Sequence, residues 1–400
     1  MRATSFRTGT VVVGLCAALA GCGKTLAPRT AEQGAGPVAI GEHGAGGLST
    51  KNTTRLGGAT GVVDAAAVAV AVYPGLTPAT RPQAVVLVDE NDWPGALAAS
   101  TLAGHPLHAP LLYSEGGTLP QASERALSAM KPTGSAALGS AAGGAGESAR
   151  VIAIGGAPAP AGYATRSVQG ANAPLLAVAI ERLASSLRGH TPRRVIVTAA
   201  EAPPAMTAPA AGLAAQSAAP ILFVQRARVP KETADELERL GRPSIYVVGP
   251  TSVVSERAAR ELESFGAVTR IEGADPQSNA VAVARFSDGT FGWGVVEPGH
   301  GLVFANAQRP LDGPAAAPLS ATGDYAPLLL LESPDRLGSA LGSYLGDLQP
   351  GTPPSGPVHG VYNHGWLMGD ESAIAVATQA QIDATLQISP REAAEPTPAP

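Results

Sequence analysis

Short apolar runs and helical stretches alternate along most of the chain, in an order that repeats three times. In each repeat an Ala- and Val-rich stretch of helical character precedes a β-branched run, at 62–72 and 84–88, at 174–187 and 194–198, and at 278–286 and 301–305. Short continuous apolar runs separated by helices are typical of parallel strands buried on both faces. The pattern therefore predicts an α/β fold.

Each repeat continues with three further segments of the same kind. An Ala-Pro pair opens an apolar run at 109–113, 219–223 and 326–330, an amphipathic helix follows at 119–130, 231–240 and 334–348, and a second apolar run closes the unit at 151–156, 245–250 and 358–363. The segment Asn363-His364-Gly365-Trp366 departs from this pattern. We expect it to form an exposed loop in a divergent third unit.

The spacing of single residues indicates three tandem copies. Arg55, Arg166 and Arg270 open the copies and are 111 and 104 residues apart, and the prolines of the Ala-Pro pairs are 110 and 107 residues apart. We predict repeats at 53–163, 164–267 and 268–388. Right-handed crossovers would make each one a small parallel sheet flanked by helices, which is a Rossmann-like arrangement.

The first 22 residues predict export. Arg2 and Arg7 precede ten apolar residues, too few to span a hydrocarbon core of ~30 Å, and Leu19-Ala20-Gly21 leads directly to Cys22. This is similar to a bacterial lipobox, so we predict a lipoprotein signal peptide at 1–21 and a lipid on Cys22 that anchors the protein to the extracytoplasmic face of the cell membrane. An ordinary secretory leader with an incidental cysteine is the alternative.

The ends of the chain lack apolar periodicity. Residues 22–52 are rich in Gly, Ala, Thr and Pro, which predicts a flexible tether between the anchor and the repeats. Residues 389–400 contain Pro and Glu and are predicted to be a disordered tail.

Composition and charge exclude several classes of protein. The 400 residues are 45% apolar, and the net charge of −5 becomes −7 if Arg2 and Arg7 leave with a leader, so nothing suggests nucleic-acid binding. The two cysteines, Cys16 and Cys22, both lie in the leader region. The repeats therefore have no disulfide and no thiolate metal site.

No motif predicts catalysis, a cofactor or a metal site. Gly23-Lys24-Thr25 lacks the first glycine of a phosphate loop, and Gly155-Gly156 lacks the rest of a dinucleotide motif. His105 and His108 have a loose metal-ligand spacing without a third ligand. Because no Gly-x-Ser-x-Gly elbow is present and the seven histidines do not recur between repeats, we expect no enzymatic activity.

These motifs together resemble the cell wall binding repeat 2 family. Its repeat opens with Arg-Leu-x-Gly, as in Arg55-Leu56-Gly57-Gly58, has a Pro-Ile-Leu-Leu-type strand, as in Pro220-Ile221-Leu222, and ends a later strand in Val-Gly-Gly, as in Ile154-Gly155-Gly156. The resemblance covers residues 53 to about 388. It implies three copies around a pseudo-threefold axis that hold the protein to an anionic polymer of the cell wall.

The resemblance also implies where a polymer would bind. The Pro-Ile-Leu-Leu-type strands match Pro110, Leu111, Leu112, Pro220, Ile221, Leu222, Pro327, Leu328 and Leu329. An apolar strand cannot itself hold an anion, so contact would come from neighbouring loops or backbone N–H groups. The family usually continues its opening motif with Asp-Arg-Tyr, whereas here only Asp275 matches.

The three opening arginines allow two interpretations. Arg55, Arg166 and Arg270 could bind phosphate or carboxylate groups with two parallel hydrogen bonds, or they could be structural residues that satisfy loop carbonyls. The sequence thus favours a non-catalytic, lipid-anchored surface protein that associates with an anionic glycopolymer of the wall. The alternatives are a solute-binding lipoprotein of a transporter and a repeat scaffold that has lost polymer binding.

Overall fold

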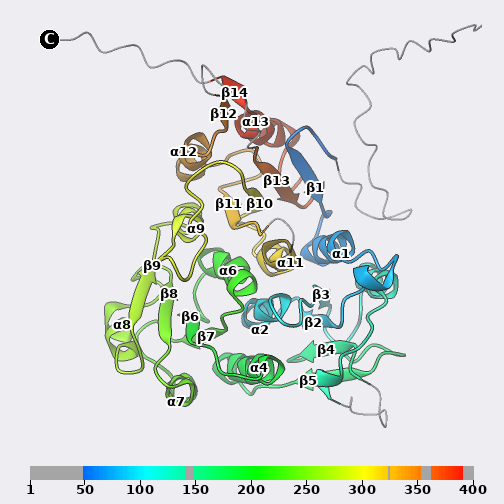
Figure 1. Ribbon diagram of the computed structural model, residues 1–400, viewed down its shortest axis with the longest axis vertical. Helices are drawn as coiled ribbons and strands as arrows, with labels where there is room; N and C mark the ends of the chain where they lie inside the picture. Colours follow the sequence, from blue (N-terminus) through cyan, green and yellow to red (C-terminus); the bar gives the residue numbers. More distant parts are fainter. Residues whose placement is uncertain (1–47, 140–147, 323–324, 353–361, 391–400) are drawn as a thin grey trace, which may run out of the picture. The chain divides into compact units, whose positions relative to one another are not determined.

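A computed structural model describes residues 48–139, 148–322, 325–352 and 362–390 of the protein. These residues form three four-stranded parallel sheets flanked by helices (Figure 1). In strand order, sheet 1 is β3 (Leu111–Ser114), β2 (Val85–Asp89), β4 (Val151–Ile154) and β5 (Thr165–Val168); sheet 2 is β7 (Ile221–Val224), β6 (Arg194–Ala199), β8 (Ser244–Val248) and β9 (Val268–Ile271); sheet 3 is β11 (Leu328–Leu331), β10 (Gly301–Asn306), β13 (His364–Met368) and β1 (Thr53–Leu56). The predicted fold of three Rossmann-like α/β repeats is confirmed.

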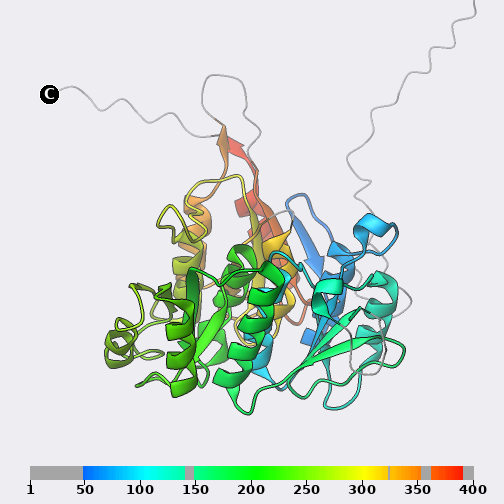
Figure 2. The ribbon, with the colours of Figure 1, turned by 60° about the horizontal axis from the view of Figure 1, so that its bottom comes forward.

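The sheets are offset from the sequence repeats by one strand. The strand that opens each sequence repeat pairs with the last strand of the preceding unit, so β5 joins sheet 1 and β9 joins sheet 2. In the same way β1 pairs with β13, with Thr53 beside Gly365 and Leu56 beside Met368 (Figures 1 and 2). Sheet 3 is therefore built from both ends of the described chain.

Three equivalent helices follow these edge strands and connect neighbouring sheets. They are α1 (Gly61–Val72), α4 (Ala173–Arg188) and α9 (Pro276–Arg285). Each begins at a polar N-cap, Thr60, Asn172 or Asp275, whose side chain accepts a hydrogen bond from a backbone N–H three residues later. Each then packs on an edge strand of the following sheet, β3, β7 or β11.

The other helices complete the layers around the sheets. The predicted amphipathic helices are α3 (Gln121–Met130), α7 (Lys231–Leu240) and α12 (Ser339–Asp347). The remaining α-helices are α2 (Trp93–Ala99), α5 (Pro204–Thr207), α6 (Pro209–Ser217), α8 (Glu256–Leu262), α10 (Asp312–Ala315), α11 (Ala317–Ala321) and α13 (Val376–Leu386), with 3-10 turns η1 (Pro78–Thr80), η2 (Ser100–Ala103) and η3 (Ala136–Leu138). No helix of the described residues is both long and apolar enough to cross a membrane.

The three repeats meet at three equivalent small-residue helices. These are η2, α6 and α11, and Ala103, Ala215, Ala317 and Ala321 form a buried cluster between them. A Cβ atom on Gly212 of α6 would lie 2.7 Å from the Oγ atom of Ser320 on α11. Ala and Gly therefore permit the close approach that the predicted pseudo-threefold arrangement requires.

The last central strand differs from the prediction. The predicted run at 358–363 lies mostly outside the described residues, and His364-Gly365-Trp366, expected in an exposed loop, belongs to the central strand β13. The equivalent strands all end before a glycine with a positive φ, at Gly155 (57°), Gly249 (118°) and Gly369 (87°). The glycine was the better marker, because the strand must turn where only Gly is unstrained.

Parts of the predicted tether and tail belong to the folded body. The backbone N–H of Asn52 donates to Asp383 Oδ1 at 2.7 Å, and its Nδ2 donates to Asp383 O at 2.9 Å. At the other end, β14 (Ser389–Pro390) pairs with β12 (Gly351–Thr352). The predicted leader, Cys22, and the other residues of the tether and tail lie outside the described residues.

Candidate functional site

The nine residues of the Pro-Ile-Leu-Leu-type strands are structural core. All residues of β3, β7 and β11 are buried, and so are the three prolines that precede these strands. Leu112, Leu222 and Leu329 are fully buried, each with an exposed fraction of 0%. A polymer cannot touch these side chains in the folded protein, so any contact near them must involve the loops.

Arg55 is a buried structural arginine. Its Nε and Nη2 both donate to Gln379 Oε1, at 3.1 and 2.8 Å, and Nη2 also donates to the carbonyl of Ile374 at 2.7 Å. Its Nη1 donates to the carbonyls of Gly369 and Asp370, at 3.1 and 2.7 Å. The guanidinium therefore uses its five donors to hold β1 against the segment that follows β13, and none is left for a polymer.

The other two opening arginines are partly exposed and lie in different sheets. Arg270 donates to the carbonyl of Gly249 at 2.9 Å and forms an ion pair with Glu256 at 3.2 Å. Arg166 donates to the carbonyl of Leu138. The structure does not bring the three arginines together, and each one joins neighbouring segments.

At each junction between repeats, one equivalent helix position holds a different type of residue. Four residues after the N-caps of α1, α4 and α9 stand Asp64, Leu176 and Asn279. Asp64 Oδ1 accepts from the backbone N–H of Gly58 at 2.5 Å, and Asn279 Oδ1 accepts from that of Gly273 at 3.0 Å. The side chain of Asn279 reaches the preceding repeat, where its Nδ2 donates to Met206 O at 2.7 Å.

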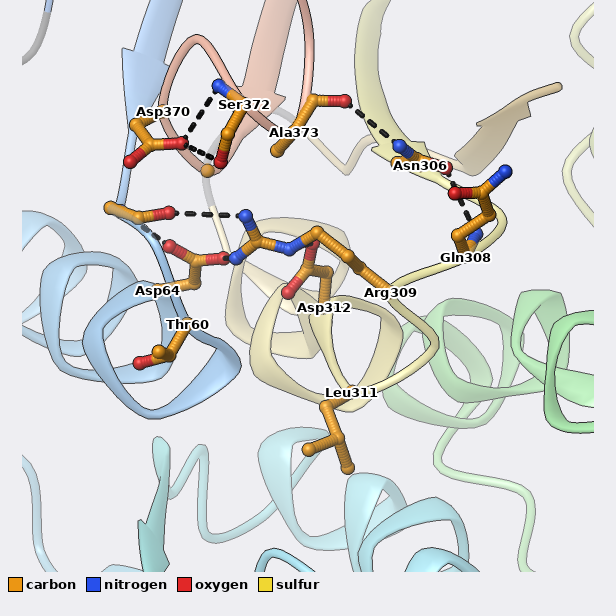
Figure 3. A network of polar contacts seen from close by, with 12 residues as sticks. Thr60, Asp64, Asn306, Gln308, Arg309, Leu311, Asp312, Asp370, Ser372 and Ala373 are labelled. Carbon is orange, nitrogen blue, oxygen red and sulfur yellow. Dashed lines mark hydrogen bonds and ion pairs between the residues drawn. The ribbon is translucent and has the colours of Figure 1, made fainter. Parts of the chain in front are cut away.

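Among the residues that the structure describes, the junction of the third and first repeats alone contains a buried ion cluster at this position. Arg309, from the loop after β10, pairs with Asp64 on α1 and, through Nε at 3.2 Å, with Asp312 on α10 (Figure 3). Both carboxylates have side-chain exposures of 0%. A ligand cannot reach them, so the cluster is a structural connection and not a binding site.

Two buried carboxylates share one guanidinium in this cluster. Burial, with the neighbouring Asp312, raises the pKa of Asp64 to about 9. Burial also raises the pKa of Asp312, to about 6. One positive charge neutralises one carboxylate, so near neutral pH the pair retains one proton.

Three neighbouring cavities on the second repeat are lined by arginines. The first, of about 680 Å³, lies between the end of α4, the start of β6 and the end of α6; the second, of about 620 Å³, lies between α4 and α7; the third, of about 310 Å³, lies between α4 and β5. Their linings contain no Asp or Glu. We define the arginine face by the arginines of these linings: Arg166, Arg182, Arg188, Arg193, Arg194 and Arg239.

Two buried glutamates lie beneath this face and hold some of its arginines. Glu236 Oε2 pairs with Arg182 Nη2 at 2.8 Å, and Arg239 Nη2 pairs with Glu236 Oε1 at 2.5 Å and Glu181 Oε2 at 2.6 Å. Burial raises the pKa of Glu181 to about 7. Six arginines against two glutamates leave at least four positive charges, although the whole chain is acidic.

The sequence contains a local signal for this face that does not recur between the repeats. The connection from α4 to β6 reads Arg188-Gly189-His190-Thr191-Pro192-Arg193-Arg194, with three arginines and one histidine in seven residues. The segment belongs to the second repeat and is not part of the pattern that the three repeats share, so the repeat pattern does not indicate it. Of the predicted candidates, only Arg166 contributes to the arginine face.

The residues considered for metal binding do not form a site. The rings of His105 and His108 are 6.0 Å apart between centroids, and burial, with the proximity of His105, lowers the pKa of His108. Over the described ranges, no group of three or more His, Cys, Asp or Glu side chains is placed to hold a metal ion.

Comparisons with known proteins support the fold of three α/β repeats. Cwp6 from Clostridium difficile has a TM-score of 0.64 and 17% identity over 88% of this chain, and Cwp8 from the same organism has a TM-score of 0.63 and 17% identity over 85%. The N-acetylmuramoyl-L-alanine amidase LytC of Bacillus subtilis (strain 168) is 28% identical over 139 residues, or 34% of this chain. No family model matches the sequence.

These similarities are partial in length. The chain spans 50% of Cwp6, 53% of Cwp8 and 26% of LytC. At 17% identity the two solved structures establish a shared three-repeat fold.

Proposed function

We propose that this protein associates with the cell wall by holding an anionic wall polymer against the arginine face of its second repeat. The fold shared with Cwp6 and Cwp8, and the partial match to LytC, support association with the wall. The arginine face carries the finer proposal, because it combines six arginines with linings free of acidic residues. Arginine is well suited to bidentate recognition of phosphate and carboxylate groups.

The net charge of the chain opposes this association only at long range. A chain of charge −5 repels a polyanion, but the screening length in physiological salt is about 8–10 Å. At contact distance the local excess of arginines dominates. Binding to this face is therefore expected to weaken as the salt concentration rises.

The proposal includes a non-catalytic role and a lipid anchor at Cys22. The three equivalent sheets meet at η2, α6 and α11 and do not provide the two hinged lobes of a transporter's solute-binding protein. The anchor would hold the protein at the outer face of the membrane, and the arginine face would contact the polymer.

Co-sedimentation with purified sacculi tests the proposed function. The full chain carrying Cys22→Ser, which has no lipid to retain it, should pellet with native sacculi and stay in solution with sacculi stripped of their anionic polymers. Equal retention on both preparations would reject the polymer as the ligand. Retention on neither would favour a scaffold that has lost polymer binding.

A further inference from the structure

The largest cavity of the arginine face contains buried donors without partners. Arg188 Nη1 donates to the carbonyl of Ala218 at 2.8 Å, whereas Nε and Nη2 are buried and have no hydrogen-bond partner among the described residues. Native structures leave few buried donors unsatisfied, and guanidinium donors remain charged at any physiological pH. Such a group at the wall of a cavity points to a missing anionic partner.

Glu181, the acid that acts on Arg188 electrostatically, does not supply that partner. Glu181 contributes to the electrostatic surroundings of Arg188, but its Oε1 accepts from Ser185 and its Oε2 pairs with Arg239 at 2.6 Å. Glu236 is likewise engaged by Arg182 and Arg239. Within the described part of the chain, Arg188 therefore forms no ion pair with either glutamate.

Further cations come from other sides of the same cavity. Arg188 is the last residue of α4, and Arg193 and Arg194 stand at the start of β6. The exposed His190 lies between them in sequence, and its Nδ1 donates to the carbonyl of Thr191 at 3.0 Å, so that Nε2 of the neutral ring is an acceptor. The cavity thus offers guanidinium donors from the end of α4 and from the start of β6.

We propose that this cavity, the Arg188 pocket, is a binding site for a phosphate group. A carboxylate has two coplanar oxygens and suits a single guanidinium fork, whereas the tetrahedral oxygens of a phosphate accept donors from several directions. Arg188 supplies the deep contact, and Arg193 and Arg194 supply positive charge at the entrance. This inference rests on the proposed function and assigns its ligand to the phosphate groups of a wall polymer.

Titration calorimetry at low salt tests the pocket with small anions. Inorganic phosphate and sulfate should bind the full chain carrying Cys22→Ser in a saturable manner at one site, and acetate should not. Arg188→Gln should weaken phosphate binding by about tenfold or more, and Arg188→Lys should restore only part of it, because lysine keeps the charge without the fork. Arg257→Gln, an exposed site on α8 of the same repeat, is the matched control and should bind as the parent does.

A second variant keeps the test decisive if Arg188→Gln does not fold. Arg194→Gln changes an exposed side chain at the pocket entrance and should lower phosphate affinity several-fold with an unchanged circular dichroism spectrum. Absence of saturable phosphate binding, equal affinity for acetate, or unchanged affinity in both variants would overturn the assignment.

The outcome separates this inference from the proposed function. Retention on sacculi without phosphate binding would reject the Arg188 pocket and leave wall association intact. Phosphate binding without retention on sacculi would reject wall association and leave the Arg188 pocket intact. Polymer released from the sacculi should compete with inorganic phosphate, whereas vesicles of phosphatidylglycerol should not; competition by the vesicles alone would assign the phosphate to lipid headgroups and overturn the polymer assignment.

Discussion

Replacement of Asp64 by Asn should remove a loss of stability that the parent protein shows as the pH rises above neutrality. In the folded state the Asp64–Asp312 pair retains one proton between pH values of about 6 and 9, because Arg309 neutralises only one carboxylate. In the unfolded chain both carboxylates have the ordinary pKa of about 3.8 and hold no proton there. Because the folded state binds more protons, the free energy of unfolding falls as the pH rises through this range.

The size of the effect follows from the difference in the number of bound protons between the folded and unfolded states. A difference of one proton changes the free energy of unfolding by about 1.4 kcal/mol per pH unit, or about 3 kcal/mol between pH 6.5 and 8.5. In Asp64→Asn one carboxylate faces one guanidinium, so this contribution disappears. The amide oxygen can still accept from the Gly58 N–H, as Asn279 accepts from Gly273 at the equivalent position, whereas its Nδ2 faces the Nη2 of Arg309, a contact whose cost does not depend on pH. Other titrating groups, such as Glu181, cancel in the difference between parent and variant.

Urea unfolding followed by tryptophan fluorescence at several pH values would measure this difference. The reciprocal variant Asn279→Asp places a carboxylate against the Met206 carbonyl, so it should lower stability at neutral pH by about 3–5 kcal/mol and recover on acidification. Parallel plots of stability against pH for the parent and Asp64→Asn would show that the buried pair holds no proton. A difference in stability that moves in favour of the parent as the pH rises would equally refute the reasoning.

Three further predictions concern the other candidate residues. Arg55→Lys should lower the free energy of unfolding by about 3 kcal/mol, since lysine cannot satisfy Gln379 and three carbonyls at once; unchanged urea unfolding would contradict a structural role. Leu112→Ala should lower the free energy of unfolding by about 2–5 kcal/mol but leave the retention of folded protein on sacculi unchanged. Loss of retention would show that this strand takes part in polymer binding. Cys22→Ser should abolish palmitate labelling and release the protein from membranes, and a labelled variant would disprove the anchor.

Local sequence signals were sufficient to predict most elements of the fold. The runs that became β2, β6 and β10 were recognisable because each is continuously apolar and follows a small-residue helix. The pairing of each opening strand with the preceding unit could not be predicted, because β1 resembles β5 and β9 in sequence and the partner of a strand is not encoded locally. The sequence period therefore defines the repeat unit but not the sheet to which its first strand belongs.

The roles of the arginines could not be decided from sequence for a related reason. Gln379, which occupies two donors of Arg55, is 324 residues away along the chain, and only the closure of sheet 3 brings the two together. The arginine face has a local signal at 188–194, but its meaning depends on Arg166, Arg182 and Arg239, which come from β5, α4 and α7. For the candidate site, the informative features were therefore those that distinguish one repeat from the others.

The central claim is that the arginine face holds an anionic wall polymer, and salt-dependent binding to sacculi with a matched pair of variants tests it most directly. Arg193→Gln with Arg194→Gln removes two exposed arginines from the face, and Arg257→Gln with Arg260→Gln removes two exposed arginines from α8 of the same repeat. The first double variant should bind native sacculi at least about tenfold more weakly, with a shallower dependence on salt, while the second binds as the parent does. Equal losses in the two double variants, or no loss in the first, would contradict the claim.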